Sequence, residues 1–434
     1  MKSFFIETYG CQMNKSDSSK VSNALKKSGY IEVNDNQNAD IILINTCSVR
    51  QSAENRIWGR LGFYKNLKSK KDIILLLIGC MAQRLGEDIF SLSDTVNIVV
   101  GVQSINKIPE ILKNYKSNEK PVYTVEKKIK FNKSIPDKEN PKKAFVTISH
   151  GCNNYCSYCI VPFLRGKEIS RKSGEIIEDI NQLTEKGVIQ VTLLGQNVNS
   201  YGKDITDLSF PELLKKICRE TDIKWIKYLS SHPKDFTDEL INVIINENKV
   251  SNWLHLALQS GSNKILKEMN RKYNREYYIE KVEKLKKSIP DLNLTTDILV
   301  GFPGETEEDF LQTVDLIKKI EFDDAYMYKY NSRKGTSAFN ELKDNIPAEE
   351  KRKRLSTIID LQRNISRKKK LNRINTDFEV IAEKWSKRSD NEILGLTKED
   401  LMIIFKGDFN DFRDIIRINA VGLRGNTLFG EKII

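Results

Sequence analysis

The sequence of 434 residues has no long apolar run. Its longest run, IILLLI at residues 73–78, is far shorter than the roughly 20 apolar residues that a membrane-spanning helix needs. The first residues, MKSFFIETYGCQMN, become polar at Glu7, before the apolar core of a secretory signal could form. We therefore expect no membrane span and a cytoplasmic location.

Cysteine is also scarce, and its number is odd. Seven cysteines in a chain without a secretory signal do not suit a framework of disulfides, because cytoplasmic thiols are kept reduced. In such chains, grouped cysteines more often bind metal or take part in chemistry.

The charge is unbalanced toward cations, with 71 Lys and Arg against 59 Asp and Glu and a formal net charge of +12. This excess indicates an anionic partner such as nucleic acid, whose phosphates favour Lys and Arg through release of counterions. Lysine is abundant throughout the chain, so a general compositional bias stays open as the alternative.

The first third of the chain alternates short apolar runs with helical stretches. The runs at residues 3–8, 41–45 and 73–78 are rich in Ile, Leu and Phe, as strands buried on both faces are, and residues 16–28 have a helical pattern. This alternation predicts a parallel α/β sheet. Residues 114–143 are polar and interrupted by prolines, which predicts a linker.

The alternation restarts at residue 144 and predicts six β/α units. The expected strands are residues 145–149, 191–195, 226–230, 254–258, 294–300 and 325–330. Six such units predict a (β/α)6 partial TIM barrel, with function at the carboxyl ends of the strands. A basic helix at 348–370 follows, and short runs punctuated by glycine predict a small antiparallel β-barrel at the end. The predicted domains are 1–140, 141–370 and 371–434.

Three closely spaced cysteines follow the first strand of the second domain. Cys152, Cys156 and Cys159 form a C-x3-C-x2-C pattern in HGCNNYCSYCIVPFLRG. Three thiolates suit a [4Fe-4S] cluster that leaves one iron open to a substrate or cofactor. Zinc with His150 as a fourth ligand is the alternative, but no second C-x2-C pair follows, as a structural zinc site usually requires.

Polar residues and glycines stand at the ends of the later strands of this domain. Together they predict a cofactor pocket, although each alone could serve only a turn. They are Gly195, Gln196 and Asn197 in LLGQN, residues 230–233, Gln259 and Ser260 in LQSGS, and Asp297 in DILVGFPG.

A second set of cysteines lies in the first domain. Cys11, Cys47 and Cys80 each follow one of the three apolar runs. Because the carboxyl ends of parallel strands meet at one edge of a sheet, we expect these thiols to converge and to hold a second cluster. Buried cysteines that merely end core strands are the alternative. Cys218 lies inside a helical stretch and is interpreted as core.

The C-x3-C-x2-C spacing, with Tyr158 before the last cysteine, resembles that of the radical S-adenosylmethionine superfamily. TYGCQMN, NTCSVR and IGCMAQR resemble the N-terminal signature of its methylthiotransferase branch, most like the bacterial tRNA adenosine methylthiotransferases of the MiaB type. The resemblance continues through LLGQNVNSYG, LALQSGS, the MNR that ends at Arg271, TTDILVGFPGETEEDF and YKYNSRKGT.

The resemblance implies two [4Fe-4S] clusters and S-adenosylmethionine as cofactors. The implied cluster ligands are the six cysteines of the two sets, and no catalytic residue beyond the clusters is implied. The residues implied to contact S-adenosylmethionine are Tyr158, Gly195, Gln196, Asn197, Gln259, Ser260, Arg271 and Asp297.

The implied activity is methylthiolation of tRNA. Sulfur and a methyl group from S-adenosylmethionine would be added at C2 of N6-isopentenyladenosine, at position 37 beside the anticodon. Three alternatives stay open: methylthiolation of a ribosomal protein, methylthiolation of threonylcarbamoyl-adenosine in tRNA, and a non-enzymatic iron–sulfur regulator that binds RNA.

The C-terminal segment resembles a TRAM domain, a small barrel that binds RNA, although Leu396 stands where the family typically has Arg. Its basic and aromatic residues suit phosphates and stacked bases, with a solvated surface as the alternative. They are Trp385, Lys387, Arg388, Lys406, Arg417 and Arg424, and residues 351–354 and 367–370 of the basic helix are further candidates. The expected partners are the anticodon stem-loop of tRNA, an electron donor such as flavodoxin or ferredoxin, and a sulfur or cluster donor. We expect a monomer.

Overall fold

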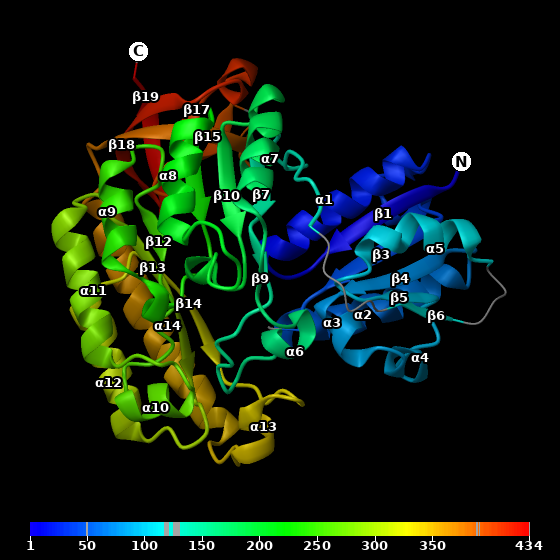
Figure 1. Ribbon diagram of the computed structural model, residues 1–434, viewed down its shortest axis with the longest axis horizontal. Helices are drawn as coiled ribbons and strands as arrows, with labels where there is room; N and C mark the ends of the chain where they lie inside the picture. Colours follow the sequence, from blue (N-terminus) through cyan, green and yellow to red (C-terminus); the bar gives the residue numbers. More distant parts are fainter. Residues whose placement is uncertain (49–50, 117–120, 125–130, 388, 390, 434) are drawn as a thin grey trace. The chain divides into compact units, whose positions relative to one another are not determined.

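The computed structural model describes residues 1–48, 51–116, 121–124, 131–387, 389 and 391–433, which form two compact units (Figure 1). The first unit consists of Met1–Asp137, His150–Asn153 and Cys159–Glu168, and the second of Lys138–Ser149, Asn154–Tyr158 and Ile169–Ile434. The division into three domains at residues 140 and 370 stays a prediction.

The first unit is built on a six-stranded sheet in which every pair of neighbours is parallel, in the order β2-β1-β3-β4-β5-β6. The prediction of a parallel α/β sheet is confirmed. The strands are β1 (Ser3–Thr8), β2 (Ile31–Glu32), β3 (Ile41–Thr46), β4 (Ile74–Gly79), β5 (Ile98–Val100) and β6 (Val122–Thr124).

Helices cover both faces of this sheet because its central strands are apolar on both sides. Leu43 of β3 packs in a cluster with α1 and α5, whereas Ile44 packs in another with α2, α3 and α4. Every residue of β3 and β4 is buried, as expected for strands of this kind. The helices are α1 (Gln12–Lys27), α2 (Gln51–Lys68), α3 (Cys80–Leu85), α4 (Asp88–Leu92), α5 (Ile108–Asn114) and α6 (Val161–Arg165).

The segment 114–143 is not wholly a linker, and this expectation was wrong in part. Within it β6 pairs with β5 as an edge strand of the sheet. Its side chains explain the pairing, because Val122 packs into the cluster on one face and Tyr123 into the cluster on the other. Residues 117–120 and 125–130 of this segment lie outside the described part of the chain.

The second unit contains six parallel strands that follow one another in chain order. They form two three-stranded sheets, β11-β10-β7 and β12-β13-β14, which parallel bridges join at Ile226–Val250 and Ser231–Leu256. The predicted (β/α)6 partial barrel is confirmed. Its strands are β7 (Lys143–Thr147), β10 (Gln190–Leu194), β11 (Trp225–Tyr228), β12 (Trp253–His255), β13 (Asn293–Val300) and β14 (Asp324–Lys329).

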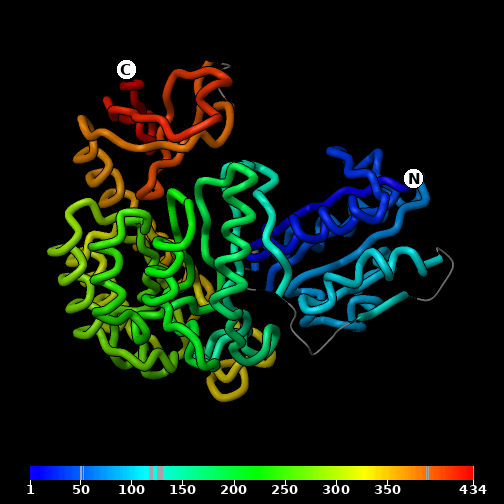
Figure 2. The backbone as a smooth tube through the Cα atoms, turned by 45° about the horizontal axis from the view of Figure 1, so that its top comes forward, coloured from blue at the N-terminus to red at the C-terminus, as the bar shows by residue number. Residues whose placement is uncertain are grey.

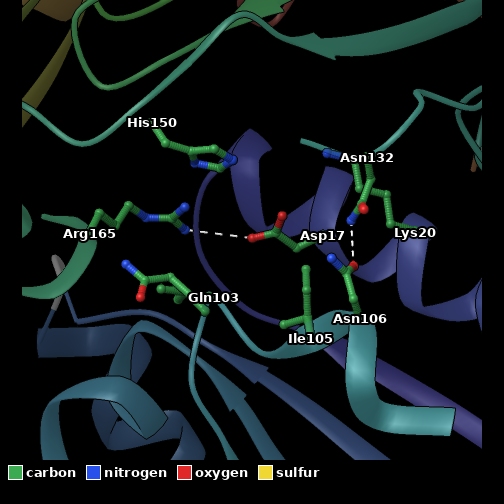
Figure 3. A pocket seen from close by; sticks show the side chains of 9 residues that line it. Asp17, Lys20, Gln103, Ile105, Asn106, Asn132, His150 and Arg165 are labelled. Carbon is green, nitrogen blue, oxygen red and sulfur yellow. Dashed lines mark hydrogen bonds and ion pairs between the residues drawn. The ribbon is translucent and has the colours of Figure 1, made fainter. Parts of the chain in front are cut away.

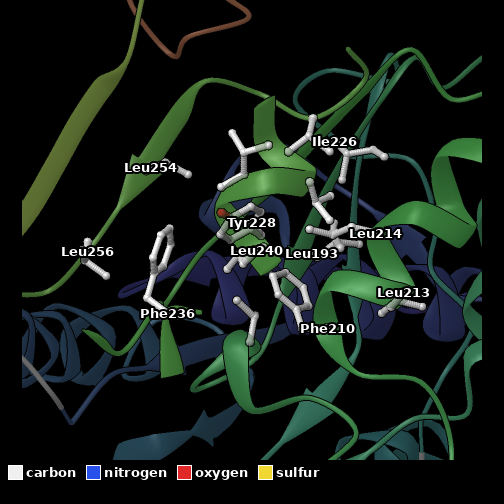
Figure 4. Packing of buried hydrophobic residues seen from close by; sticks show 14 of the residues in the cluster. Leu193, Phe210, Leu213, Leu214, Ile226, Tyr228, Phe236, Leu240, Leu254 and Leu256 are labelled. Carbon is white, nitrogen blue, oxygen red and sulfur yellow. The ribbon is translucent and has the colours of Figure 1, made fainter. Parts of the chain in front are cut away.

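Amphipathic helices pack on these strands and bury the main core of the unit. In Figure 4, Leu193 and Tyr228 of the strands face Phe210 and Leu214 of α8 and Leu240 of α9. Cys218, also on α8, lies in this core as expected. The helices are α7 (Ser173–Glu185), α8 (Phe210–Glu220), α9 (Asp238–Asn246), α10 (Asn263–Glu268), α11 (Arg275–Ser288), α12 (Glu307–Ile320), α13 (Ser337–Glu341) and α14 (Ala348–Leu371).

The chain ends in a small closed barrel, as predicted, in the order β15-β16-β17-β19-β18. One of its pairs, β17 with β19, is parallel, so the expectation of a purely antiparallel barrel was wrong in this detail. The reason is geometric, because an odd number of strands cannot close a ring in which every neighbour reverses direction. The strands are β15 (Asp377–Trp385), β16 (Glu392–Thr397), β17 (Met402–Lys406), β18 (Ile416–Arg424) and β19 (Thr427–Lys432).

The small barrel, orange to red in Figure 2, is tied to the amino-terminal part of the partial barrel by its β16–β17 turn. Lys227 Nζ of β11 donates to the Thr397 carbonyl oxygen at 3.2 Å and to Asp400 at 2.8 Å. Asn293, the first residue of β13, donates to the Glu399 carbonyl oxygen. These hydrogen bonds do not involve the carboxyl ends of the partial-barrel strands, where most of the candidate site residues lie.

Candidate active site

The three cysteines of the first unit lie at the carboxyl ends of neighbouring strands. β1, β3 and β4 are adjacent in the sheet, Cys47 directly follows β3, and Cys80 directly follows β4 and begins α3. Cys11 follows β1 by three residues and is the N-cap of α1. The expected convergence of these residues at one edge of the sheet is confirmed, whereas their role as metal ligands stays a prediction.

Two glycines allow the strand ends to approach closely enough. A Cβ atom on Gly10, at φ +122°, would lie 2.8 Å from Cys47 Cβ. A Cβ atom on Gly79, at φ +91°, would lie 2.6 Å from the Thr46 carbonyl oxygen. Asn14 of α1 joins the same loops, because its Nδ2 donates to the Tyr9 and Thr46 carbonyl oxygens at 2.9 and 2.7 Å. The glycines and the asparagine of the TYGCQMN and IGC motifs therefore serve to bring these strand ends close together.

The thiols at this edge influence one another electrostatically. Cys47 and Cys80 are buried and Cys11 is exposed. Burial raises the pKa of the Cys80 thiol to about 11; Arg165 opposes this shift, and the neighbouring Cys11 and Cys47 add to it. The ionised form of Cys80, disfavoured by burial and by its two neighbours, would gain from the iron core of a cluster held between the three cysteines.

The C-x3-C-x2-C pattern forms the loop between β8 (Ser149–His150) and α6. Gly151 starts the loop at φ +78°, where a Cβ atom would collide with the Lys167 carbonyl oxygen at 2.0 Å. The Cys152 amide donates to the Gly166 carbonyl oxygen at 3.2 Å. Cys152 and Cys156 are buried, and Cys159 is partly exposed.

The segment that contains MNR holds the middle of this loop. The Ser157 amide donates to the Met269 carbonyl oxygen at 3.1 Å, and Asn270 Nδ2 donates to the Tyr155 carbonyl oxygen at 2.8 Å. Arg271 is 4% exposed and donates to Cys156 Sγ at 3.3 Å. The position of Cys156 thus depends on residues more than a hundred positions away in the chain.

The predicted Tyr158 and Arg271 are brought together beside Cys156. The Tyr158 hydroxyl lies 3.5 Å from Arg271 Nη1, while the other nitrogens of the guanidinium donate to the Ala257 carbonyl oxygen at 2.8 Å and to the Tyr273 hydroxyl at 3.1 Å. Tyr273, two residues before α11, was not identified from the sequence, because no local pattern distinguishes it.

The residues of LLGQN take different positions. Gly195 passes close to Ser149, whose Oγ would lie 2.4 Å from a Cβ atom there. Asn197 is buried, donates to Asp235 at 2.7 Å and accepts from the His232 amide at 3.2 Å, so it joins the ends of β10 and β11. Gln196 is partly exposed at the end of β10. Their contacts to S-adenosylmethionine stay predictions.

Gln259 and Ser260 follow β12, whereas Asp297 lies within β13 and not at its end, in contrast to the prediction. Gln259 has φ +70°, and its amide donates to the Asp297 carbonyl oxygen at 2.8 Å. Asp297 Oδ2 lies 3.1 Å from Nε2 of His255, a residue that was not identified from the sequence. The Ser260 hydroxyl is turned into the core beside Thr313, so the structure does not group it with the others.

Among the described residues, no three His, Cys, Asp or Glu side chains converge as ligands of one ion. The cysteines of a four-iron cluster bind different irons and stand farther apart, so this finding leaves the cluster unaffected.

Four of the five described C-terminal residues proposed for RNA are exposed, namely Lys387, Lys406, Arg417 and Arg424. Trp385 is partly buried against the barrel core and packs on Phe409 and Phe412, with ring centroids 5.2 and 5.5 Å apart. Arg417 pairs with Asp377 at 3.6 Å, and Arg424 pairs with Glu392 at 2.6 Å. Lys387 and Lys406 are exposed, Leu396 is partly exposed, and Arg388 lies outside the described residues.

Two residues of the basic helix α14 do not face solvent, in contrast to one interpretation of its sequence. Lys351 donates to Asp344 at 2.6 Å, and Arg354 donates to Glu305 at 2.7 Å. Both are 6% exposed, because a long side chain on the packed face of a helix can carry its charge to a buried partner.

None of the helices among the described residues combines the length and the apolar character that a membrane crossing needs.

Comparison with known proteins agrees with this geometry. Residues 3–101 match the family described as Uncharacterized protein family UPF0004, and residues 146–317 match the Radical SAM superfamily. The tRNA-2-methylthio-N(6)-dimethylallyladenosine synthase of Clostridium botulinum is 42% identical over 436 residues, which cover 99% of this chain and 97% of that protein. This chain belongs to that synthase family.

The synthase of the same description from Treponema denticola is 44% identical over 93% of this chain and 94% of its own length. Among solved structures, the radical S-adenosylmethionine methyltransferase TsrM from Kitasatospora setae, with cobalamin and a [4Fe-4S] cluster bound, has a TM-score of 0.55. The match covers 78% of this chain and 74% of TsrM at 11% identity, so it supports the fold alone. As a radical SAM family, the synthases use S-adenosylmethionine and [4Fe-4S] cofactors, which the two cysteine sets fit.

Proposed function

We propose that this chain methylthiolates C2 of N6-isopentenyladenosine in tRNA, at position 37 beside the anticodon. The family supports this proposal, since the relatives that match over nearly the whole chain are named for that product. The observation that carries it is the second set of cysteines, Cys11, Cys47 and Cys80, at the ends of three adjacent strands. A generator of radicals alone needs only the C-x3-C-x2-C loop.

In this proposal, the residues of this chain bind the cofactors and orient them. Cys152, Cys156 and Cys159 hold one cluster, and Cys11, Cys47 and Cys80 hold the other. When bound, the clusters and S-adenosylmethionine would supply the radical and the methyl group, and the N-terminal cluster would carry the incoming sulfur.

Arg271 fixes Cys156 and Tyr158 in place, because it donates to both while it is anchored to the Ala257 carbonyl oxygen. The chemistry also needs an electron donor and a source of sulfur.

Recognition of tRNA falls to the C-terminal barrel and to exposed cations. Lys387 and Lys406 are exposed on the barrel and suit phosphate contacts, which give affinity without sequence information. The target base has to leave the stack of the anticodon loop to reach the site, and an unpaired loop makes this extrusion cheap.

The test is mass spectrometry of nucleosides from tRNA of cells that lack the gene. We expect 2-methylthio-N6-isopentenyladenosine to disappear and its precursor to accumulate. The wild-type gene and a Cys218→Ala variant should restore the product, whereas replacing Cys11, Cys47 and Cys80 by Ala should not. Cys218 is the matched control because it is buried in the core of α8. Product that persists in the deletion strain would refute the assignment of the substrate.

A further inference from the structure

A buried arginine lies against one of the proposed cluster ligands of the first unit. Arg165, the last residue of α6, is 5% exposed. Its Nη2 lies 3.6 Å from Cys80 Sγ and also 3.6 Å from Asp17 Oδ2 of α1, so the guanidinium contacts a thiol and a carboxylate together. Figure 3 shows the side chains of Arg165 and Asp17 directed toward one another.

Packing holds Arg165 in this position. Ile160 and Leu164, just before it, pack with Cys80 and Val102 in one apolar cluster. α6 then ends at Gly166, whose φ of +80° turns the chain away. The contact between Arg165 and Cys80 is therefore built into the packing around α6 and does not depend on a mobile surface side chain.

The charges beside Arg165 are cationic on balance. The pocket that Arg165 and Asp17 line also contains Lys20, His150, Gln103, Asn106 and Asn132, and Asp17 is its one carboxylate among the described residues. Among the described charges of this pocket, Arg165 is also the one cation that acts on Cys80. Because Arg165 and Asp17 are both buried, solvent screens their effect on Cys80 less than it would at the surface.

A cation in this position affects the redox behaviour of a thiolate-bound cluster. Reduction places one electron from the external reductant on an already anionic group, with no bond formed or broken. A nearby positive charge and a hydrogen bond to a ligand sulfur both stabilise the reduced form.

We propose that Arg165 is a positioning residue of the N-terminal cluster, where it hydrogen-bonds the Cys80 thiolate and raises the reduction potential, while Asp17 holds the guanidinium and moderates its charge. The inference rests on the proposed assignment of Cys11, Cys47 and Cys80 as cluster ligands.

The test uses the full chain with Cys152, Cys156 and Cys159 replaced by Ala, so that only the N-terminal cluster forms on anaerobic reconstitution. Iron counting should give about four irons per chain. Titration with dithionite, followed by electron paramagnetic resonance, then gives the midpoint potential.

In this background Arg165→Gln should lower the equilibrium constant for reduction about tenfold, about 59 mV for one electron. Arg165→Lys keeps the charge and should shift the potential less than half as far. Asp17→Asn removes the negative charge and should shift it in the positive direction.

Arg60→Gln is the matched control, because Arg60 is a partly buried arginine of the same unit that pairs with Glu7 at 3.0 Å and does not contact a cysteine among the described interactions. An unchanged potential in iron-loaded Arg165→Gln, or an equal shift in Arg60→Gln, would overturn the role of Arg165. If Arg165→Gln fails to hold iron, the midpoint potential of Asp17→Asn becomes the deciding measurement. An unchanged potential in that variant overturns the proposal. A parent protein without iron would instead refute the cysteine assignment itself.

Discussion

Gly79 offers a sharp test of how the strand end before Cys80 is built. Its φ of +91° and ψ of −159° lie in a region that is almost restricted to glycine, so an alanine there costs about 1–3 kcal/mol in backbone strain. The new Cβ atom would also lie 2.6 Å from the Thr46 carbonyl oxygen and 2.9 Å from its amide nitrogen. These are backbone atoms, so relieving the clash adds about 1–3 kcal/mol.

Gly29 provides the control for Gly79→Ala. It has φ +87°, but a Cβ atom there would meet no atom within 4 Å. Gly29→Ala should therefore cost only the strain of a left-handed residue, about 1–2 kcal/mol. The two variants differ mainly by the collision beside Cys80.

The assay is amide hydrogen exchange followed by mass spectrometry, because a chain of several domains need not unfold in one step. Peptides that cover β3 and β4 should exchange about tenfold faster in Gly79→Ala than in Gly29→Ala, while peptides from β13 should be unchanged in both. The first variant should also reconstitute less iron at the N-terminal cysteines. Equal exchange of β3 and β4 in the two variants would refute the close-approach argument.

Three further predictions concern the second unit. Burial raises the pKa of Asp309, but hydrogen bonds from Ser262, Thr306 and Lys264 outweigh it and lower this pKa to about 2. Asp309→Asn should therefore destabilise α12 at pH 7 by about 2 kcal/mol. Hydrogen exchange should show that this difference shrinks as the pH falls from 4 toward 2. Arg271→Lys cannot keep all four hydrogen bonds of the guanidinium, so formation of 5′-deoxyadenosine should fall at least about tenfold, whereas a change to Lys at exposed Arg219 should leave it intact. Lys406→Glu should weaken tRNA binding and reduce its salt slope by about one, and a binding isotherm that matches wild type at every salt concentration would remove Lys406 from the interface.

Much of the fold could be predicted from the sequence because its strands are strongly patterned. The run at residues 3–8 coincides with β1, and the order of the six barrel strands follows from their alternation with helices. β6 was missed because it has only three residues, and its side chains gain their role from the two faces of a sheet that the local pattern does not reveal.

The site was predictable where one strand or one loop determines it. The convergence of Cys11, Cys47 and Cys80 needs only the rule for parallel strands. In contrast, 85 residues separate Cys80 from Arg165, and no local pattern relates them. Charge was the least reliable guide, since Arg354 looks like a surface residue until Glu305 is seen beside it.

The strand ends that carry the N-terminal cysteines are fixed by contacts that do not involve the cysteines. Asn14 Nδ2 bonds the Thr46 carbonyl oxygen, the Asn45 side chain donates back to the Asn14 carbonyl oxygen at 2.9 Å, and the Thr46 hydroxyl bonds both the Ile78 carbonyl oxygen and the Met81 amide. These bonds tie the residues around Cys11, Cys47 and Cys80 into one network. A site that is ordered before it binds loses less entropy on binding, so the network favours binding of a cluster by these three cysteines.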